Sequence, residues 1–217
     1  MTDILLTFFI ISLIYLSIAN RLMAYVGNLV FQGLLICGIA ILSLEHLTIL
    51  NLSMILLETL VVKAILMPFF IRRVIISNKI TRETEPSVPY YVSLIMTTVF
   101  IIGSYLIATS IESTTLNKSY FVAALSGLLS GLYLIATRRK VITHVICYVV
   151  IENGAFVLSL GIGSEMPVLV NLGVLLDVLV SVFLLGIFIN KVGDVTGDGD
   201  IQHLNMLNDY PQTETEK

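Results

Sequence analysis

The chain has 217 residues, of which 57% are hydrophobic and 12% are charged, and its formal net charge is −3. A soluble domain needs more charge than this to solvate its surface, so the composition excludes an ordinary soluble protein. The small net charge indicates little, because its distribution along the chain matters more. The apolar residues fall in seven long runs separated by polar breaks, so lipid is the expected solvent.

A helix of about 20 apolar residues crosses the hydrocarbon core of a bilayer. The runs therefore predict an all-α integral membrane fold with seven transmembrane helices. They are expected at residues 4–20, 22–43, 49–71, 90–110, 119–137, 141–162 and 167–190. Most breaks are short, so successive helices should pack as antiparallel neighbours. The one long loop is expected from Arg72 to Pro89, and a polar tail follows Lys191.

The distribution of lysine and arginine predicts the orientation of these spans. If the N-terminus lies outside, only Lys118 faces the outside, and Lys63 lies within a span. The remaining bases then all lie on the cytoplasmic side: Arg21, Arg72, Arg73, Lys79, Arg82, Arg138, Arg139, Lys140, Lys191 and Lys217. This asymmetry predicts an outside N-terminus, a cytoplasmic C-terminus and, for a prokaryote, a multi-pass protein of the plasma (inner) membrane.

An internal repeat is visible in two places. Residues 55–61 (ILLETLV) resemble residues 174–180 (VLLDVLV), and residues 15–21 (YLSIANR) resemble residues 133–138 (YLIATR). We therefore expect two parallel three-helix repeats, at 1–73 and 119–192. Residues 74–118 would supply a cytoplasmic loop and a linking fourth helix, and 193–217 a cytoplasmic tail. Chance similarity between apolar segments remains the alternative.

Four charged residues lie near the middle of predicted spans: Glu58, Lys63, Glu152 and Asp177. A charge at the bilayer centre costs at least about 2.5–3.5 kcal/mol, so such residues are functional candidates by default. Glu152 and Asp177 lie at comparable depths on consecutive spans, which suits a proton relay. The alternative is that each is a protonated carboxyl group that hydrogen-bonds two helices together.

Two further residues could extend this relay toward the cytoplasm. Tyr148 precedes Glu152 by four positions, so it shares a helix face with it and could donate a hydrogen bond. His144 lies two turns from Glu152, toward the cytoplasmic end. Together they predict a His–Tyr–Glu file for protons. For His144, a position at the membrane interface without any relay role is the alternative.

Glu58 and Lys63 are five positions apart, about 140° around an α-helix, so they are not expected to share a face. Lys63 is expected to reach another helix, toward Glu152, Asp177 or a partner subunit. Pro68 should free a backbone carbonyl near Lys63 and kink the span there. A purely structural Lys–Glu pair is the alternative.

Other chemistry finds little support in the sequence. Residues 194–200 (DVTGDGD) resemble the start of a calcium loop, but the twelfth position is Asn205 rather than a bidentate glutamate. No phosphate-binding loop, zinc spacing or nucleophile elbow is present. Cys37 and Cys147 are isolated within apolar runs and cannot ligate an iron–sulfur cluster. We expect no cofactor, metal or catalytic residue in this chain.

The order of several short motifs resembles membrane component E of hydrogenase-4 and formate hydrogenlyase (HyfE). That family has Met-Glu-Asn-Gly in its sixth helix, where this chain has Ile-Glu-Asn-Gly at 151–154, and Lys-x-x-x-x-Pro in its third, which is Lys63 to Pro68 here. Its Asp-x-x-x-Leu segment after the last helix matches Asp200 to Leu204. The resemblance covers nearly the whole chain.

The last three predicted helices also resemble the small K subunit of respiratory complex I. That subunit has two intramembrane glutamates on consecutive helices, which correspond to Glu152 and Asp177. The second position is aspartate here, so its reach is shorter by one methylene. The resemblance implies a non-redox subunit packed between antiporter-like subunits. It implies that nickel–iron and iron–sulfur centres lie in partner chains, and that no nucleic acid binds.

The sequence therefore leads to one main expectation and two alternatives. The main expectation is an ion-translocating subunit, with the proton as the leading ion, of a membrane-bound hydrogenase or formate hydrogenlyase-like complex. Glu152 and Asp177 would exchange protons, with Glu58 and Lys63 tuning or extending the path. The alternatives are a subunit of a multisubunit cation/proton antiporter without a redox arm, and a scaffold that only joins larger subunits.

Overall fold

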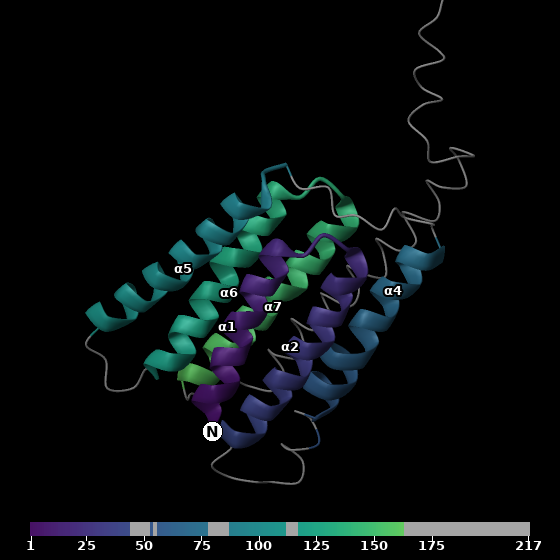
Figure 1. The fold of residues 1–217 in the computed structure, drawn as a ribbon. Helices are drawn as coiled ribbons and strands as arrows, with labels where there is room; N and C mark the ends of the chain where they lie inside the picture. The colour runs from purple at the N-terminus through teal and green to yellow at the C-terminus, as the bar shows by residue number, and fades with distance from the viewer. Residues whose placement is uncertain (44–52, 54–55, 78–86, 112–116, 163–217) are drawn as a thin grey trace, which may run out of the picture.

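The structure, a computed structural model, describes residues 1–43, 53, 56–77, 87–111 and 117–162 (Figure 1). Every regular element in these ranges is a helix, and the same ranges contain no strand. The helices are α1 (Thr2–Ile18), α2 (Leu22–Ser43), η1 (Leu57–Leu66), α4 (Met67–Ser77), α5 (Tyr90–Ser110), α6 (Lys118–Thr137) and α7 (Val141–Ile162). η1 is a π-helix that continues directly into α4.

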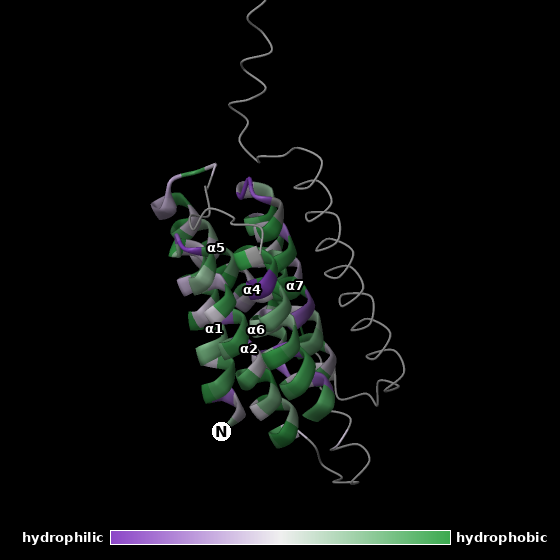
Figure 2. Cartoon of the chain, turned by 90° about the vertical axis from the view of Figure 1, so that its right-hand side faces the viewer, coloured by the Kyte–Doolittle hydropathy of each residue, from purple (hydrophilic) through white to green (hydrophobic). Residues whose placement is uncertain are grey.

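Four of the described helices are long and apolar enough to cross a membrane. They are α2, α5, α6 and, within α7, residues Ile142–Gly161, while α1 is apolar over a shorter length. Most of the ribbon of the described helices carries the colour of hydrophobic residues (Figure 2). On α5, for example, Ile95 and Ile102 are more than half exposed. Exposure of so much apolar surface to water is unfavourable, whereas lipid solvates it, so the chain is a membrane protein.

The observed helices test six of the seven predicted spans. α2, α5 and α7 begin and end as predicted, and α1 and α6 differ by one or two residues. The third span was predicted to end at residue 71, which is wrong, because α4 continues to Ser77 and includes Arg72 and Arg73. Hydropathy marks the hydrocarbon core, whereas the backbone ladder runs on into the headgroup region, where arginine is solvated. The predicted span 167–190 and the tail lie outside the described residues.

Short connections make successive helices antiparallel, as expected. Residues 19–21 join α1 to α2, and residues 138–140 join α6 to α7. α2 lies against α1, η1 and α7, while α6 lies between α5 and α7 (Figure 1). Large apolar side chains fill the space between these helices, among them Phe9, Leu13, Leu16, Leu29, Ile36, Leu134 and Ile146. Single buried serine, threonine and asparagine side chains interrupt this apolar interior, and its charged side chains gather in two polar clusters.

The first polar cluster surrounds Arg138, which the orientation argument had assigned to a cytoplasmic loop. Its side chain is 2% exposed, and Nη2 donates a hydrogen bond to the carbonyl oxygen of Ser17 at 3.0 Å. The rings of Tyr25 and Tyr90 lie 5.8 and 5.9 Å from its Cζ atom, within cation–π range. The guanidinium thus fastens the end of α6 to the end of α1 and to the first turns of α2 and α5.

Candidate functional site

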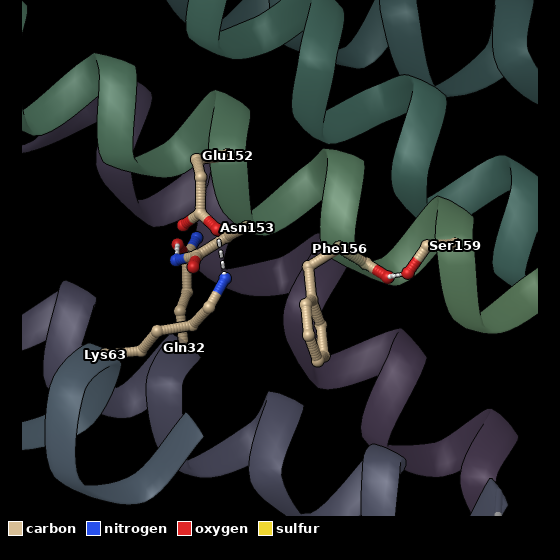
Figure 3. Close-up of polar contacts among 6 residues, drawn as sticks. All are labelled: Gln32, Lys63, Glu152, Asn153, Phe156 and Ser159. Atoms are coloured by element: carbon tan, nitrogen blue, oxygen red, sulfur yellow. Dashed lines mark hydrogen bonds and ion pairs between the residues drawn. The ribbon is translucent and has the colours of Figure 1, made fainter. Parts of the chain in front are cut away.

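The second polar cluster contains an ion pair between η1 and α7. Lys63 Nζ lies 2.5 Å from Glu152 Oε1, and the two side chains are 2% and 10% exposed (Figure 3). The sequence left Glu152, Asp177 and a partner subunit open as partners of Lys63, and the structure shows Glu152 in contact with it. Each charge is desolvated, and only a close opposite charge makes such burial tolerable.

The ring of Phe156 closes one side of the ion pair. Phe156 follows Glu152 by one turn of α7, and Lys63 Nζ lies 4.4 Å from the centroid of its ring. The ring is buried and presents its negative π face to the ammonium, which adds attraction and leaves less room for water. Ser159 on the next turn bonds the carbonyl oxygen of Phe156, within the same helix (Figure 3).

Glu58 belongs to the same electrostatic cluster, contrary to the geometry expected from the sequence. The 140° separation from Lys63 assumed an α-helix, but residues Leu57–Leu66 form a π-helix. In a π-helix, residues i and i+5 are joined by a hydrogen bond and stack one turn apart, so Glu58 and Lys63 share a face. Glu58 is 8% exposed, and its carboxyl interacts electrostatically with both Lys63 and Glu152.

Pro68 explains where the π-helix must end. The last π-type bond joins the N–H of Met67 to the carbonyl oxygen of Val62. The next bond of that ladder would need an N–H at Pro68 pointing to the carbonyl of Lys63, and proline has none. The chain therefore continues as the α-helix α4. The sequence predicted a freed carbonyl near Lys63 and a kink, and the structure shows a change of helix type after Leu66.

A chain of hydrogen bonds extends from Asn153, beside the ion pair, through α2 to α1. Asn153, next to Glu152, donates from Nδ2 to Gln32 Oε1 at 3.1 Å (Figure 3). Gln32 Nε2 donates to Ser12 Oγ at 2.9 Å, and Ser12 donates to the carbonyl oxygen of Phe9 at 2.6 Å. Gln32, Ser12 and Asn153 are all buried. Asn153 Oδ1 accepts no hydrogen bond from any described residue, so one acceptor stays open beside the pair.

The Glu-Asn-Gly motif joins α7 to three different helices. Glu152 pairs with η1 and Asn153 bonds α2, as described above, whereas Gly154 faces α6. A Cβ atom at Gly154 would lie 3.0 Å from the backbone nitrogen of Leu128 and 3.1 Å from the carbonyl oxygen of Ala124. Helices approach this closely only through small residues. The motif therefore fixes the position of the carboxylate from all sides.

Gly33 lets η1 approach α2 beside Lys63. A Cβ atom at this position would lie 2.8 Å from both Cα and N of Ala64, which are backbone atoms that cannot move alone. Overpacking of this kind costs about 1–3 kcal/mol. We therefore expect Gly33→Ala to lower the melting temperature by several degrees and to weaken the Lys63–Glu152 contact.

Gly27, on the same helix, provides the matched control. A Cβ atom there has no neighbour within 4 Å, so Gly27→Ala should leave the melting temperature unchanged or raise it slightly. Cys37 and Cys147 are free and buried, so a thiol-reactive dye reports unfolding of purified protein in detergent. Equal melting temperatures for the two variants would contradict the close approach of η1 to α2.

The other predicted site residues are not joined to the cluster. Tyr148 is 42% exposed, and its side chain makes no hydrogen bond to Glu152 or to any other described residue. His144 is half-buried near the start of α7, and its side chain likewise makes no hydrogen bond within the described ranges. The expected file from His144 to Glu152 is therefore not connected by direct hydrogen bonds. Asp177 lies outside the described residues.

Gln32 and Ser12 are cluster members that the sequence argument missed. Polar residues of this kind occur singly in many apolar spans, and only their shared depth in the bundle brings them to Asn153. A glutamine in the middle of the α2 run was the available signal. Among the described residues, no three histidine, cysteine, aspartate or glutamate side chains lie close enough together to hold a metal ion.

Comparison with known proteins adds one distant relative. The chain is similar to the uncharacterized protein Rv0085 of Mycobacterium tuberculosis (strain ATCC 25618 / H37Rv), with 27% identity over 164 residues. The matched region covers 70% of this chain and 71% of the relative. No protein-family model matches the chain, and no solved structure matches it. What the chain does must therefore be inferred from its own residues.

Proposed function

We propose that this chain is an ion-translocating membrane subunit, with the proton as the ion, of a hydrogenase or formate hydrogenlyase-like complex. The observation that carries this proposal is the buried pair of Lys63 and Glu152, with Glu58 in electrostatic range of both. Helix packing alone requires no charge at this depth, and a buried charge is costly unless it is used or compensated.

Two carboxylates and one ammonium make a set that can couple movement to protonation. Lys63 compensates the negative charge of a carboxylate fully only at close range. In the structure Lys63 lies against Glu152. When Lys63 swings toward Glu58, Glu152 loses its counter-ion and takes up a proton, because a bare buried carboxylate is too costly. Glu58 gives up its proton to the other side in the same step. On the return movement Glu152 passes its proton to Glu58, so each cycle carries one proton from one side to the other and the cluster keeps its net charge.

The remainder of the path belongs to the same proposal. Seven spans, an outside N-terminus and two parallel repeats would place Asp177 one helix beyond Glu152, where it would continue the relay. Asn153 Oδ1 offers an open acceptor beside the pair. The asymmetric distribution of lysine and arginine supports the orientation in a prokaryotic plasma membrane.

The type of complex is proposed from the resemblance to hydrogenase-4 component E. Its motif residues Lys63, Pro68 and Glu152 to Gly154 all lie at or next to the ion pair. Partners would be antiporter-like membrane subunits, with the nickel–iron and iron–sulfur centres in further chains. A cation/proton antiporter would use the same cluster without a redox arm. Identification of copurifying chains separates these two complexes.

One observation favours a scaffold as the second candidate. The Lys63–Glu152 pair is charge-balanced and joins η1 to α7, as a structural link would. A scaffold predicts that neutral variants lose assembly, whereas a relay predicts that they keep assembly and lose ion movement. The two readings therefore differ in a measurable way.

We expect Glu152→Gln and Asp177→Asn each to abolish coupled ion movement. Both are nearly isosteric and remove the ability to exchange a proton, and Glu152→Gln also removes the negative charge that faces Lys63. The measurement uses the intact complex in liposomes with a pH-sensitive dye inside, and native gel electrophoresis of the same preparations checks assembly. The control is Asp3→Asn, which neutralises an exposed carboxylate at the start of α1, away from the cluster. Full ion movement in both site variants would refute the relay.

A further inference from the structure

The outer face of η1 and α4 carries an apolar stripe that ends in two arginines. Leu57, Val61, Ile65 and Phe69 are spaced four residues apart and are 52%, 47%, 58% and 57% exposed. Residues at this spacing lie above one another on a helix, so they form one continuous line. The stripe leads directly to Arg72 and Arg73, which are both exposed.

A pocket marks the point where the stripe meets the arginines. It has a volume of about 310 Å³ and is open to the surface, and Phe69, Arg72, Arg73 and Ile76 line it. Neither arginine makes a hydrogen bond or an ion pair with any described residue. The nine residues after Ser77 contain two bases and two acids, so they add no net charge. The pocket therefore combines two guanidinium groups, without an ion-pair partner among the described residues, with an apolar wall.

The dimensions of this surface match one leaflet of a bilayer. From Leu57 to Phe69 an α-helix would rise by about 18 Å, and the more compact π-helical turns of η1 shorten this to about half of the ~30 Å hydrocarbon core. The arginines lie at the bundle end that also carries the α1–α2 and α6–α7 connections, where Arg21 and Arg139 are exposed (Figure 1). The stripe thus runs from the middle of the membrane to a basic surface.

We propose that an anionic phospholipid binds in this pocket, with its phosphate between Arg72 and Arg73 and an acyl chain along the stripe. Guanidinium groups hold phosphate oxygens through paired, charge-assisted hydrogen bonds. Basic pockets at the cytoplasmic ends of membrane helices are suited to such headgroups. Because η1 also carries Glu58 and Lys63, a bound lipid would stabilise the helix on which the ion pair depends.

The test compares two double variants that remove equal charge from the same end of the bundle. Wild type, R72Q/R73Q and the control R21Q/R139Q are incubated with equal amounts of phosphatidylglycerol and phosphatidylcholine, and native mass spectrometry counts the retained lipids. We expect wild type and control to retain phosphatidylglycerol, and R72Q/R73Q to retain at least tenfold less. Equal retention by all three proteins, or equal loss in both variants, would overturn the proposal.

Two further outcomes separate the lipid from other occupants. Phosphatidylglycerol should raise the melting temperature of wild type, whereas soluble glycerol 3-phosphate should not, because it cannot cover the stripe. A matching shift with glycerol 3-phosphate would indicate a simple phosphate site and overturn the proposal. If R72Q/R73Q kept its lipid but lost copurifying subunits, the face would be a protein interface, which would also overturn it.

Discussion

Replacement of Lys63 by methionine is expected to destabilise the protein by about 3–5 kcal/mol, because it leaves a buried carboxylate without its counter-ion. Methionine has nearly the length of lysine, so the packing against Phe156 is kept while the charge is lost. The loss of stability should appear as a lower melting temperature of purified protein. A thiol-reactive dye measures it, since unfolding exposes the buried Cys37 and Cys147.

The controls for this prediction follow from the geometry of the cluster. The double variant K63M/E152Q should recover most of the lost stability, because neither charge is then buried alone. E152Q by itself should cost less than K63M, since Lys63 still has Glu58 within electrostatic range. A K63M protein as stable as wild type would show that the pair is not buried as the structure describes it.

Exchange of the two charges should separate a relay from a structural link. The variant K63E/E152K keeps an opposite-charge pair between η1 and α7, so it should fold and assemble. It should nevertheless lose all coupled ion movement. Its ammonium is fixed on α7, and its two carboxylates lie together on η1, so a proton passed between them makes no progress from one helix to the other.

The measurement is again dye-detected ion movement by the complex in liposomes, with assembly checked by native gels. The neutral double variant K63M/E152Q serves as the reference for a stable but inactive cluster. If K63E/E152K moved ions at the wild-type rate, the pair would be a helix-to-helix link, and the scaffold would become the better account.

The helices themselves could be predicted from hydropathy because lipid imposes a simple rule on length. α2, α5 and α7 were predicted to the residue, since each apolar run ends at a polar or turn-forming break. The end of α4 was missed because Arg72 and Arg73 stop the apolar run but not the helix. The backbone hydrogen bonds of a helix can continue past the last apolar residue, so hydropathy does not locate the end of the helix.

The chemistry of the site was foreseen more fully than its geometry. Glu58, Lys63 and Glu152 stood out because charge is rare within apolar spans. That Glu58 shares a face with Lys63 could not be foreseen, because the spacing was read on an α-helix and residues Leu57–Leu66 form a π-helix. Gln32 was missed for a similar reason, since its importance lies in a contact with Asn153 on a distant part of the chain.

Tyr148, a predicted relay residue, forms no hydrogen bond with the cluster. Tyr148 shares a helix face with Glu152 in sequence, yet its side chain is 42% exposed and makes no bond to the carboxylate. Spacing of four residues brings side chains near one another but does not decide which way each one turns. Loss of the Tyr148 hydroxyl is therefore expected to affect ion movement less than Glu152→Gln.

Infrared difference spectroscopy tests the central claim most directly, because it detects whether Glu152 gains and loses a proton during turnover. We predict that spectra of the working complex contain a carbonyl band of a protonated carboxyl group, and that Glu152→Gln removes this band while the assembled complex remains. A band that is identical in wild type and Glu152→Gln would show that the protonation state of this glutamate never changes, and it would contradict the proposed relay.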